Sequence, residues 1–246
     1  MPPIHKLYDF VVSVFVACRN KKAGPGPEKM TRRILVGLCL WQVAGGLQLQ
    51  PLHADIEYWR VVDVSGSCEV LEAAQSDWRP LASPSNIREG SQIRTGKAGT
   101  VDIALDRGGE NAIRVNSNSA LVFLQSRPRR IRLISGSLFA LQEREKDPVE
   151  VLTGRLSARL AQGGMAVIVG ARQDAVKVFG ESAQISSSDA GGGSKYQILS
   201  EGLKLSRSGG KTEGTVVRMD FADYQEWQTW FKLNDERKDR FLLGRR

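Results

Sequence analysis

The sequence predicts an all-β domain, an antiparallel sandwich or roll of many short strands, followed by a C-terminal amphipathic helix. Three observations favour this fold. Apolar and polar residues alternate from Ile56 to about Val217, which is the period of a strand with one buried face. Turn residues interrupt the alternation about every 8–12 residues. Helical spacing of large apolar residues begins only after Asp220.

The expected strands follow one another along the chain. One polar face per strand is typical of antiparallel pairing. Val62, Val64 and Val70 are expected to frame a first strand pair, and Trp78 is expected to fill the core beneath a hairpin. Further strands are expected around Val101–Leu105, Ile113–Val115, Leu121–Leu124, Ile131–Leu133, Val149–Val151, Val167–Val169, Val176–Val178 and Leu203–Leu205.

Two segments interrupt the alternation. Ser186–Ser194 is rich in Gly and Ser and predicts a flexible surface loop. Residues 220–246 predict a helix that packs on the β domain, because large aromatic residues recur there at helical spacing and Asp220 or Asp223 can cap its start. The aromatic face consists of Tyr224, Trp227, Trp230 and Phe231.

The N-terminal part resembles a targeting segment. Residues 30–54 have the layout of a secretory signal peptide: Met30–Arg33 is positively charged, Ile34–Leu47 is apolar, and Ala54 is a small residue that suits a cleavage point. The apolar run is shorter than the roughly 20 residues of a transmembrane helix, and an uncleaved anchor is the alternative. We therefore expect a periplasmic or secreted protein that contacts membrane only through an uncleaved signal segment.

Residues 1–29 do not suit this layout, since a signal peptide normally begins the chain. We interpret them as an extension of doubtful authenticity and expect Met30 to be the start, with an N-terminal membrane hairpin as the alternative. The expected organisation is then residues 1–29 as an extension, 30–54 as a signal peptide, 55–219 as the β domain and 220–246 as the helix.

The charge of the chain also depends on this leader. The formal net charge of the 246 residues is +8, which would suit a nucleic-acid partner. Residues 1–54, however, hold seven of the 35 basic residues and only two of the 27 acidic ones. The remainder carries about +3, an ordinary balance for a small domain, and we expect no nucleic acid to bind.

The residue types that most enzymes and metal sites need are scarce. Both histidines, His5 and His53, lie in the leader, so the mature domain would have none. This excludes Ser-His-Asp and Cys-His catalysis and histidine-ligated metals. Cys68 is the only cysteine outside the leader, where we expect a small buried side chain. We therefore expect no catalytic residue, metal or cofactor.

Two groups of residues are candidates for binding. Arg127, Arg129 and Arg130 form a basic cluster that could contact phosphate or an anionic glycan, or could simply be a solvated strand face. Trp227 and Trp230 could form a sugar-stacking or partner surface, or could dock the helix onto the sheet. Exposed coplanar rings would favour a glycan ligand, and buried rings would favour a protein-interaction scaffold.

The order of several motifs resembles that of FecR domains. The most specific segment is Ile87–Gly96, which contains G-x-x-I-R-T-G. Other matching segments are Val64–Val70, Trp78–Leu81, Val101–Leu105, Asn118–Leu121, Leu133–Leu138 and Val151–Thr153. The resemblance covers roughly residues 63–206. After Val151–Thr153 the family usually has T-P and then R-G-T-x-F, whereas this chain has Gly154 and then Gly163–Met165.

The resemblance implies a non-catalytic extracytoplasmic domain that acts in protein interaction or envelope signalling. Its partner would be another envelope protein, bound through a sheet edge or a loop. A cell-wall glycan-binding module is the alternative. A hydrolase that uses paired carboxylates among Glu143, Glu145 and Asp147 is a remote alternative.

The leader yields a first testable prediction. If residues 30–54 are a cleaved signal peptide, N-terminal sequencing of the exported protein should find a start at or near Asp55. Soluble protein that still begins at Met1 or Met30 would contradict this prediction.

Overall fold

The computed structural model describes residues 59–106, 108–144, 147–187, 196–209 and 214–243, and all of these belong to the unit Ile56–Arg246. The leader and most of the expected Gly/Ser loop lie outside these residues. No helix among the described residues has the length and apolar character needed to span a membrane.

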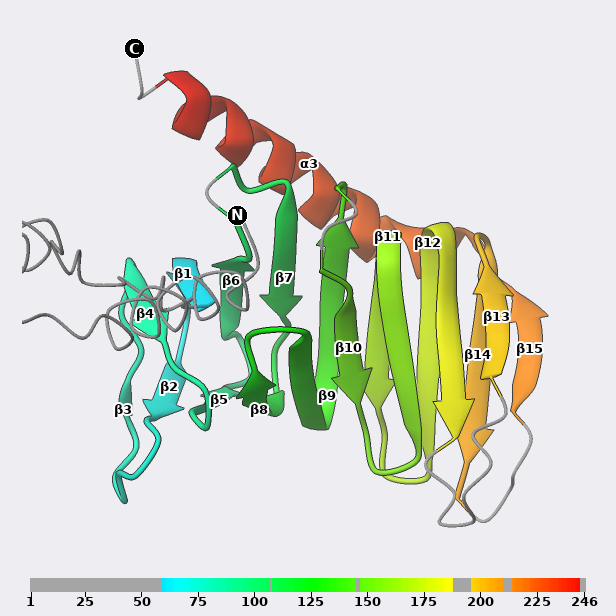
Figure 1. Ribbon diagram of the computed structural model, residues 1–246, viewed down its shortest axis with the longest axis horizontal. Helices are drawn as coiled ribbons and strands as arrows, with labels where there is room; N and C mark the ends of the chain where they lie inside the picture. Colours follow the sequence, from blue (N-terminus) through cyan, green and yellow to red (C-terminus); the bar gives the residue numbers. More distant parts are fainter. Residues whose placement is uncertain (1–58, 107, 145–146, 188–195, 210–213, 244–246) are drawn as a thin grey trace, which may run out of the picture. The chain divides into compact units, whose positions relative to one another are not determined.

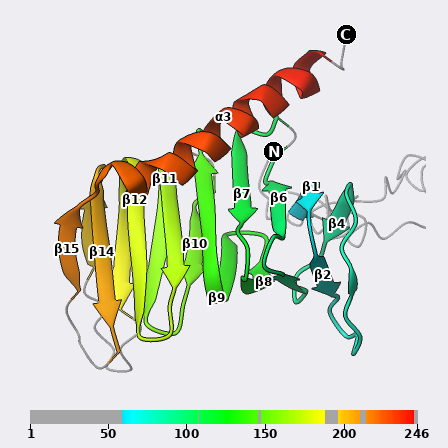
Figure 2. The ribbon, with the colours of Figure 1, turned by 180° about the vertical axis from the view of Figure 1, so that it is seen from behind.

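The described residues form one sheet of fifteen strands that is folded into two layers, with a single helix at the C-terminal end (Figures 1 and 2). Three long strands, β9, β11 and β12, run through both layers, and their two halves have different neighbours. The strands are β1 (Trp59–Ser65), β2 (Cys68–Leu71), β3 (Arg79–Pro80), β4 (Ser85–Ile87), β5 (Gln92–Thr95), β6 (Thr100–Ala104), β7 (Asn111–Val115), β8 (Ala120–Gln125), β9 (Arg129–Gln142), β10 (Val149–Leu152), β11 (Leu156–Val169), β12 (Gln173–Ser187), β13 (Tyr196–Ser200), β14 (Leu203–Ser208) and β15 (Thr215–Arg218).

We call the two layers the helix layer and the open layer. The helix layer contains β4, β1, β6, β7, β14 and β15, together with the second halves of β9 and β11 and the first half of β12. The open layer contains β3, β2, β5, β8, β10 and β13, together with the remaining halves of the long strands. The predicted all-β fold with a C-terminal helix is confirmed.

The two layers enclose the main hydrophobic core. Its largest members with less than 2% exposure include Phe123, Ile131, Leu133, Leu138, Leu156, Leu160 and Met165. Leu160 and Met165 lie on opposite sides of the bend in β11, yet both point into this core. Burial of apolar side chains from both halves of each bent strand therefore stabilises the bend.

The bend in β11 and β12 depends on close backbone contact. The pairing of these strands shifts register between Leu160 and Gln162 and again between Gly164 and Met165. At Gly163 the backbone has φ +94°, and a Cβ there would lie 2.0 Å from the carbonyl oxygen of Gly180. A side chain cannot be accommodated at this point, so glycine is needed.

The structure corrects three local expectations. Strand β1 pairs with β4 and β6 rather than with β2, because the turn at Gly66 takes the chain from the helix layer to the open layer. Strands β9 and β10 are parallel, whereas antiparallel pairing was expected. Trp78 is half-buried and outside the core, with the guanidinium of Arg94 4.3 Å from its ring centre. A cation–π contact thus takes the place of core packing.

Helix α3 (Phe221–Leu243) begins at a reciprocal cap. The backbone N–H of Asp223 donates to the Asp220 carboxylate at 3.0 Å, and the N–H of Asp220 donates to the Asp223 carboxylate at 3.2 Å. This arrangement satisfies two otherwise unpaired donors at the start of the helix. Both residues that the sequence offered as caps therefore act together.

The aromatic face of α3 packs on the helix layer in a second hydrophobic cluster. The Trp227 ring stacks on Phe179 with ring centres 4.5 Å apart, and Phe139 lies 5.6 Å from Trp230. Beneath Trp227 lies Gly164, where a Cβ would approach the indole to 2.3 Å. The missing side chain of Gly164 thus makes the space that the indole fills.

This packing predicts that the helix stabilises the domain. Trp227→Ala should reduce the free energy of unfolding by about 3 kcal/mol or more, because a large buried ring leaves a cavity. In a domain of this size the melting temperature should fall by about 10 °C. Phe221→Ala is the matched control, since Phe221 lies on the same helix but is 77% exposed. Equal melting temperatures for the wild type and Trp227→Ala would show that α3 is not part of the core.

Candidate functional site

The structure places both candidate tryptophans inside the molecule. Trp227 is 7% exposed and Trp230 is 1% exposed. Their ring planes are inclined by 70° to each other, with centres 5.1 Å apart. Sugar stacking needs an accessible ring face, which neither residue offers. Their position favours the interpretation that they dock the helix onto the sheet.

The indole N–H of Trp230 is paired with a buried carboxylate. Its indole N–H donates to Asp102 in β6 at 3.1 Å, and Asp102 is 2% exposed. Arg114 donates two hydrogen bonds to the same carboxylate at 2.8 and 2.7 Å, and Arg237 of α3 donates another at 2.8 Å. Two guanidinium groups compensate the buried charge, as such a site requires. Asp102 therefore holds the middle of α3 to the sheet.

A second acidic residue holds the start of the helix. Asp223 lies 2.8 Å from Lys177 and 3.3 Å from Lys204, which belong to neighbouring strands of the helix layer. Burial alone would raise the pKa of the Asp223 carboxyl. Hydrogen bonds from Lys177, from the Asp220 backbone and from Lys204 outweigh that effect, so its pKa lies below the usual value. The carboxylate thus remains charged at neutral pH and continues to pair with both lysines.

The three candidate arginines have different environments. Arg129 is 9% exposed and donates to the carbonyl oxygen of Leu105 at 2.5 Å, so its role is structural. Arg127 is exposed in a turn and lies 4.0 Å from Asp147. Arg130 points outward from the open layer and pairs with Glu150 at 2.8 Å. The cluster that is continuous in the sequence is therefore divided between the interior and the surface.

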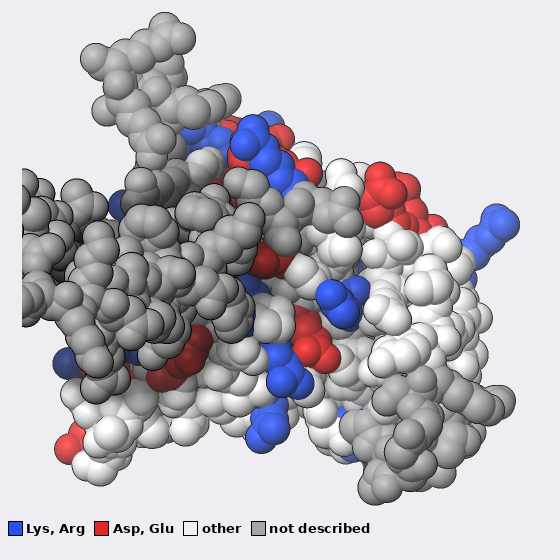
Figure 3. Space-filling model, viewed as in Figure 1, with Lys and Arg blue, Asp and Glu red and all other residues white. Residues whose placement is uncertain are grey.

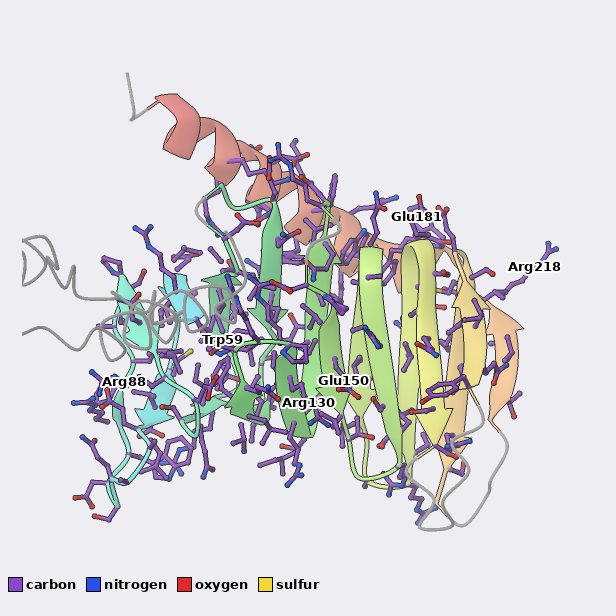
Figure 4. The ribbon with its side chains drawn as sticks, in the orientation of Figure 1. Trp59, Arg88, Arg130, Glu150, Glu181 and Arg218 are labelled. Carbon is purple, nitrogen blue, oxygen red and sulfur yellow. The ribbon has the colours of Figure 1, made fainter. Side chains whose placement is uncertain are left out.

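The outer surface of the open layer brings Arg130 together with arginines from elsewhere. Glu150 lies between Arg130 and Arg159 in the strand register. Arg132 lies two residues along β9 from Arg130 and is exposed, as is Arg159. We call the surface formed by Arg130, Arg132, Arg159, Glu150 and Leu152 the arginine face. Figure 3 shows basic side chains around one acidic side chain here, and Figure 4 shows Arg130 beside Glu150.

Arg159 was not among the residues expected at this surface. It is distant from Arg127–Arg130 in the chain and is surrounded by alternating apolar residues, where an exposed arginine is unremarkable. Only the order of strands β9, β10 and β11 brings it opposite Arg130. A local motif could not have found it.

The end of the sheet is a second accessible feature. Among the described residues, strand β15 pairs only with β14, and all four of its residues are exposed, including Val216 at 38% and Val217 at 44%. The N–H of Met219 donates inward to Gly202. Because orientation alternates along an antiparallel strand, the N–H groups of Val216 and Arg218 point away from β14. The outer edge of β15 thus offers unpaired hydrogen-bonding groups to another strand.

The remaining candidate sites offer few groups that could catalyse a reaction or bind a metal ion. Glu143 pairs with Lys238 of α3, Asp147 lies near Arg127, and Glu145 is outside the described residues. A shallow groove of about 440 Å³ lies beside Trp227 and Phe231. Within the described ranges, no three His, Cys, Asp or Glu side chains converge as a metal site would need. Cys68 is buried, and this burial raises the pKa of its thiol.

Comparisons with known proteins show a partial structural likeness. Neither the family models nor the curated protein sequences contain a match to this chain. Two crystal structures of a provisionally assigned anti-sigma factor from Parabacteroides distasonis ATCC 8503 are similar in fold. They have 13% and 14% identity to this chain and TM-scores of 0.46 and 0.45, over 56% of it. The chain spans less than two thirds of their length, 64% and 63% respectively.

The Asp102 network gives a prediction about stability. Asp102→Asn removes the charge that compensates Arg114 and Arg237, so the domain should lose about 3 kcal/mol in chemical denaturation. Asp235→Asn is the control, because Asp235 is 50% exposed and pairs with Lys238 at the surface, where such pairs contribute about 1 kcal/mol or less. Equal losses in the two variants would contradict the assignment of Asp102 as the central contact.

Proposed function

We propose that this chain is a non-catalytic, extracytoplasmic FecR-like domain that binds another envelope protein and acts in protein interaction or signalling. The observation that carries the proposal is the outer edge of β15, which is exposed and lies at the end of a rigid two-layer sheet. An extended segment of a partner can add to such an edge as a further strand. Main-chain hydrogen bonds then provide affinity and alternate side chains provide specificity.

The composition of β15 supports this role. Natural edges are usually protected by a very short strand, charged side chains, proline or bulges. The four residues of β15 are Thr, Val, Val and Arg, and they pair with β14 without a register shift. β15 is short and ends in Arg218, but it has no proline and no bulge, so its outward hydrogen-bonding groups are available to a further strand.

The FecR resemblance gains support from contacts between its motifs. Thr95, from the G-x-x-I-R-T-G segment, donates to the carbonyl oxygen of Asn116 at 2.6 Å and accepts the N–H of Ser119 at 2.9 Å. Ser119, from the second motif, donates to the carbonyl oxygen of Ser137 in β9 at 3.0 Å. The most specific motif therefore ties three segments together. These contacts give the motif a structural role, which other proteins of the same fold would be expected to share.

Other residues argue against the glycan-binding and hydrolase alternatives. A glycan module of the kind considered above needs exposed aromatic rings, and Trp227 and Trp230 are buried. A hydrolase needs a pair of available carboxylates, and Glu143 is held by Lys238. Residues 55–246 also contain no histidine. Protein binding is the function that these features support best.

A proline substitution tests the edge directly. Val216→Pro removes an outward N–H and leaves the β14 ladder intact, so the domain should stay folded while a partner loses a main-chain contact. Chemical cross-linking of the full chain in the envelope fraction, followed by mass spectrometry, should identify a protein joined to the β15 region in the wild type. Val216→Pro should no longer capture that protein.

Two controls accompany the proline variant. Arg88→Glu changes an exposed charge far from β15 and should capture the same protein as the wild type. Val217→Pro removes an inward N–H, so it should lower the melting temperature where Val216→Pro does not. Undiminished capture by folded Val216→Pro would refute strand addition at this edge.

A further inference from the structure

The geometry of the sheet sets the distances between the Cα atoms of the arginines on the arginine face. Arg130 and Arg159 are separated by one intervening strand, so their Cα atoms are about 10 Å apart. Arg130 and Arg132 point to the same side of β9, about 7 Å apart along the strand. The backbone positions of the three arginines are therefore fixed on one surface, because each residue belongs to a strand and not to a loop.

The single carboxylate on this face is already occupied. One oxygen of Glu150 accepts the Arg130 Nε–H at 2.8 Å, and the other accepts the Ser157 hydroxyl at 2.7 Å. The side chains of Arg132 and Arg159 have no hydrogen bond or ion pair within the described part of the chain. Arg94, on the same layer, differs because it is paired with Glu69 at 2.5 Å. The face thus holds an excess of positive charge with unused donors.

The neighbours of Arg132 indicate which anion would suit this face. Val122 lies on one side of it and Leu152 on the other, and both are half-buried. Guanidinium groups bind carboxylates through paired N–H donors. The aliphatic neighbours can contact the methylene groups of glutamate side chains. In an extended peptide, every second side chain points the same way at about 7 Å, which matches the spacing of Arg130 and Arg132.

We propose that the arginine face binds an extended acidic segment of a protein that lies along β9, with carboxylates at alternate positions against Arg130 and Arg132 and with Arg159 adding positive charge beside it, two strands away. This inference rests on the proposed function, since it specifies the chemistry of the partner. It concerns a different surface from the edge of β15, and the two can be tested separately.

The test uses the purified full chain and a defined probe, a capped, fluorescent octapeptide of alternating Glu and Thr. The peptide should bind at low salt and weaken at about 0.3 M NaCl, since exposed ion pairs are screened. The double variant R132E/R159E should bind at least about tenfold more weakly, which corresponds to about 1.4 kcal/mol. The analogue peptide with Gln in place of Glu should not bind.

Arg88→Glu is the matched control, because Arg88 is an exposed arginine on another part of the surface (Figure 4). It should bind the acidic peptide as the wild type does. Equal loss in Arg88→Glu would show a general charge effect and overturn the proposal, as would equal binding by R132E/R159E and the wild type. Melting temperatures of both variants establish that they are folded.

Two further probes separate other anions from a peptide. Heparin fragments and vesicles containing phosphatidylglycerol are measured in the same way. If either binds through Arg132 and Arg159 while the peptide does not, the face is not a peptide site and the proposal fails. Cross-linking at β15 and peptide binding by the purified chain are independent measurements, so the failure of one is distinguishable from the failure of the other.

Discussion

The contact between Trp227 and Gly164 is the constraint on which the rest of the domain depends. At this point β11 bends from one layer into the other, and the absence of a side chain at Gly164 leaves room for the indole. The same contact therefore couples the bend of the sheet to the docking of α3. A larger residue at Gly164 would have to displace the ring, and the second hydrophobic cluster would lose its centre.

Charged residues then fix the helix along its length. Asp223 pairs with two lysines at its start, Asp102 accepts bonds from Trp230 and Arg237 near its middle, and Lys238 reaches Glu143 further on. These partners lie in β12 and β14, in β6, and directly after β9, which are separate parts of the sheet order. The helix thus connects the β12–β14 pair to β6, with which neither strand pairs, and this braces the helix layer.

This arrangement separates the residues that hold the helix from those that remain accessible. The aromatic residues of α3 are used in the helix interface, whereas the edge of β15 and the arginine face of the open layer remain accessible. Both have backbone positions defined by strand pairing. The main-chain groups at the β15 edge are therefore already ordered, which would lower the entropic cost of pairing with a further strand.

The sequence by itself determined the strand-rich fold, the C-terminal helix and its buried aromatic face, because periods of two and 3.6 are local properties. It also marked Arg127, Arg129 and Arg130 as a basic cluster, but it could not separate buried Arg129 from Arg130, which points outward. The tertiary structure alone decided that β1 and β2 lie in different layers, that Asp102 is the contact of Trp230, and that Arg159 joins Arg130. Each of these depends on which strands become neighbours, and that is set by burial of the common core between distant segments, which no local pattern records.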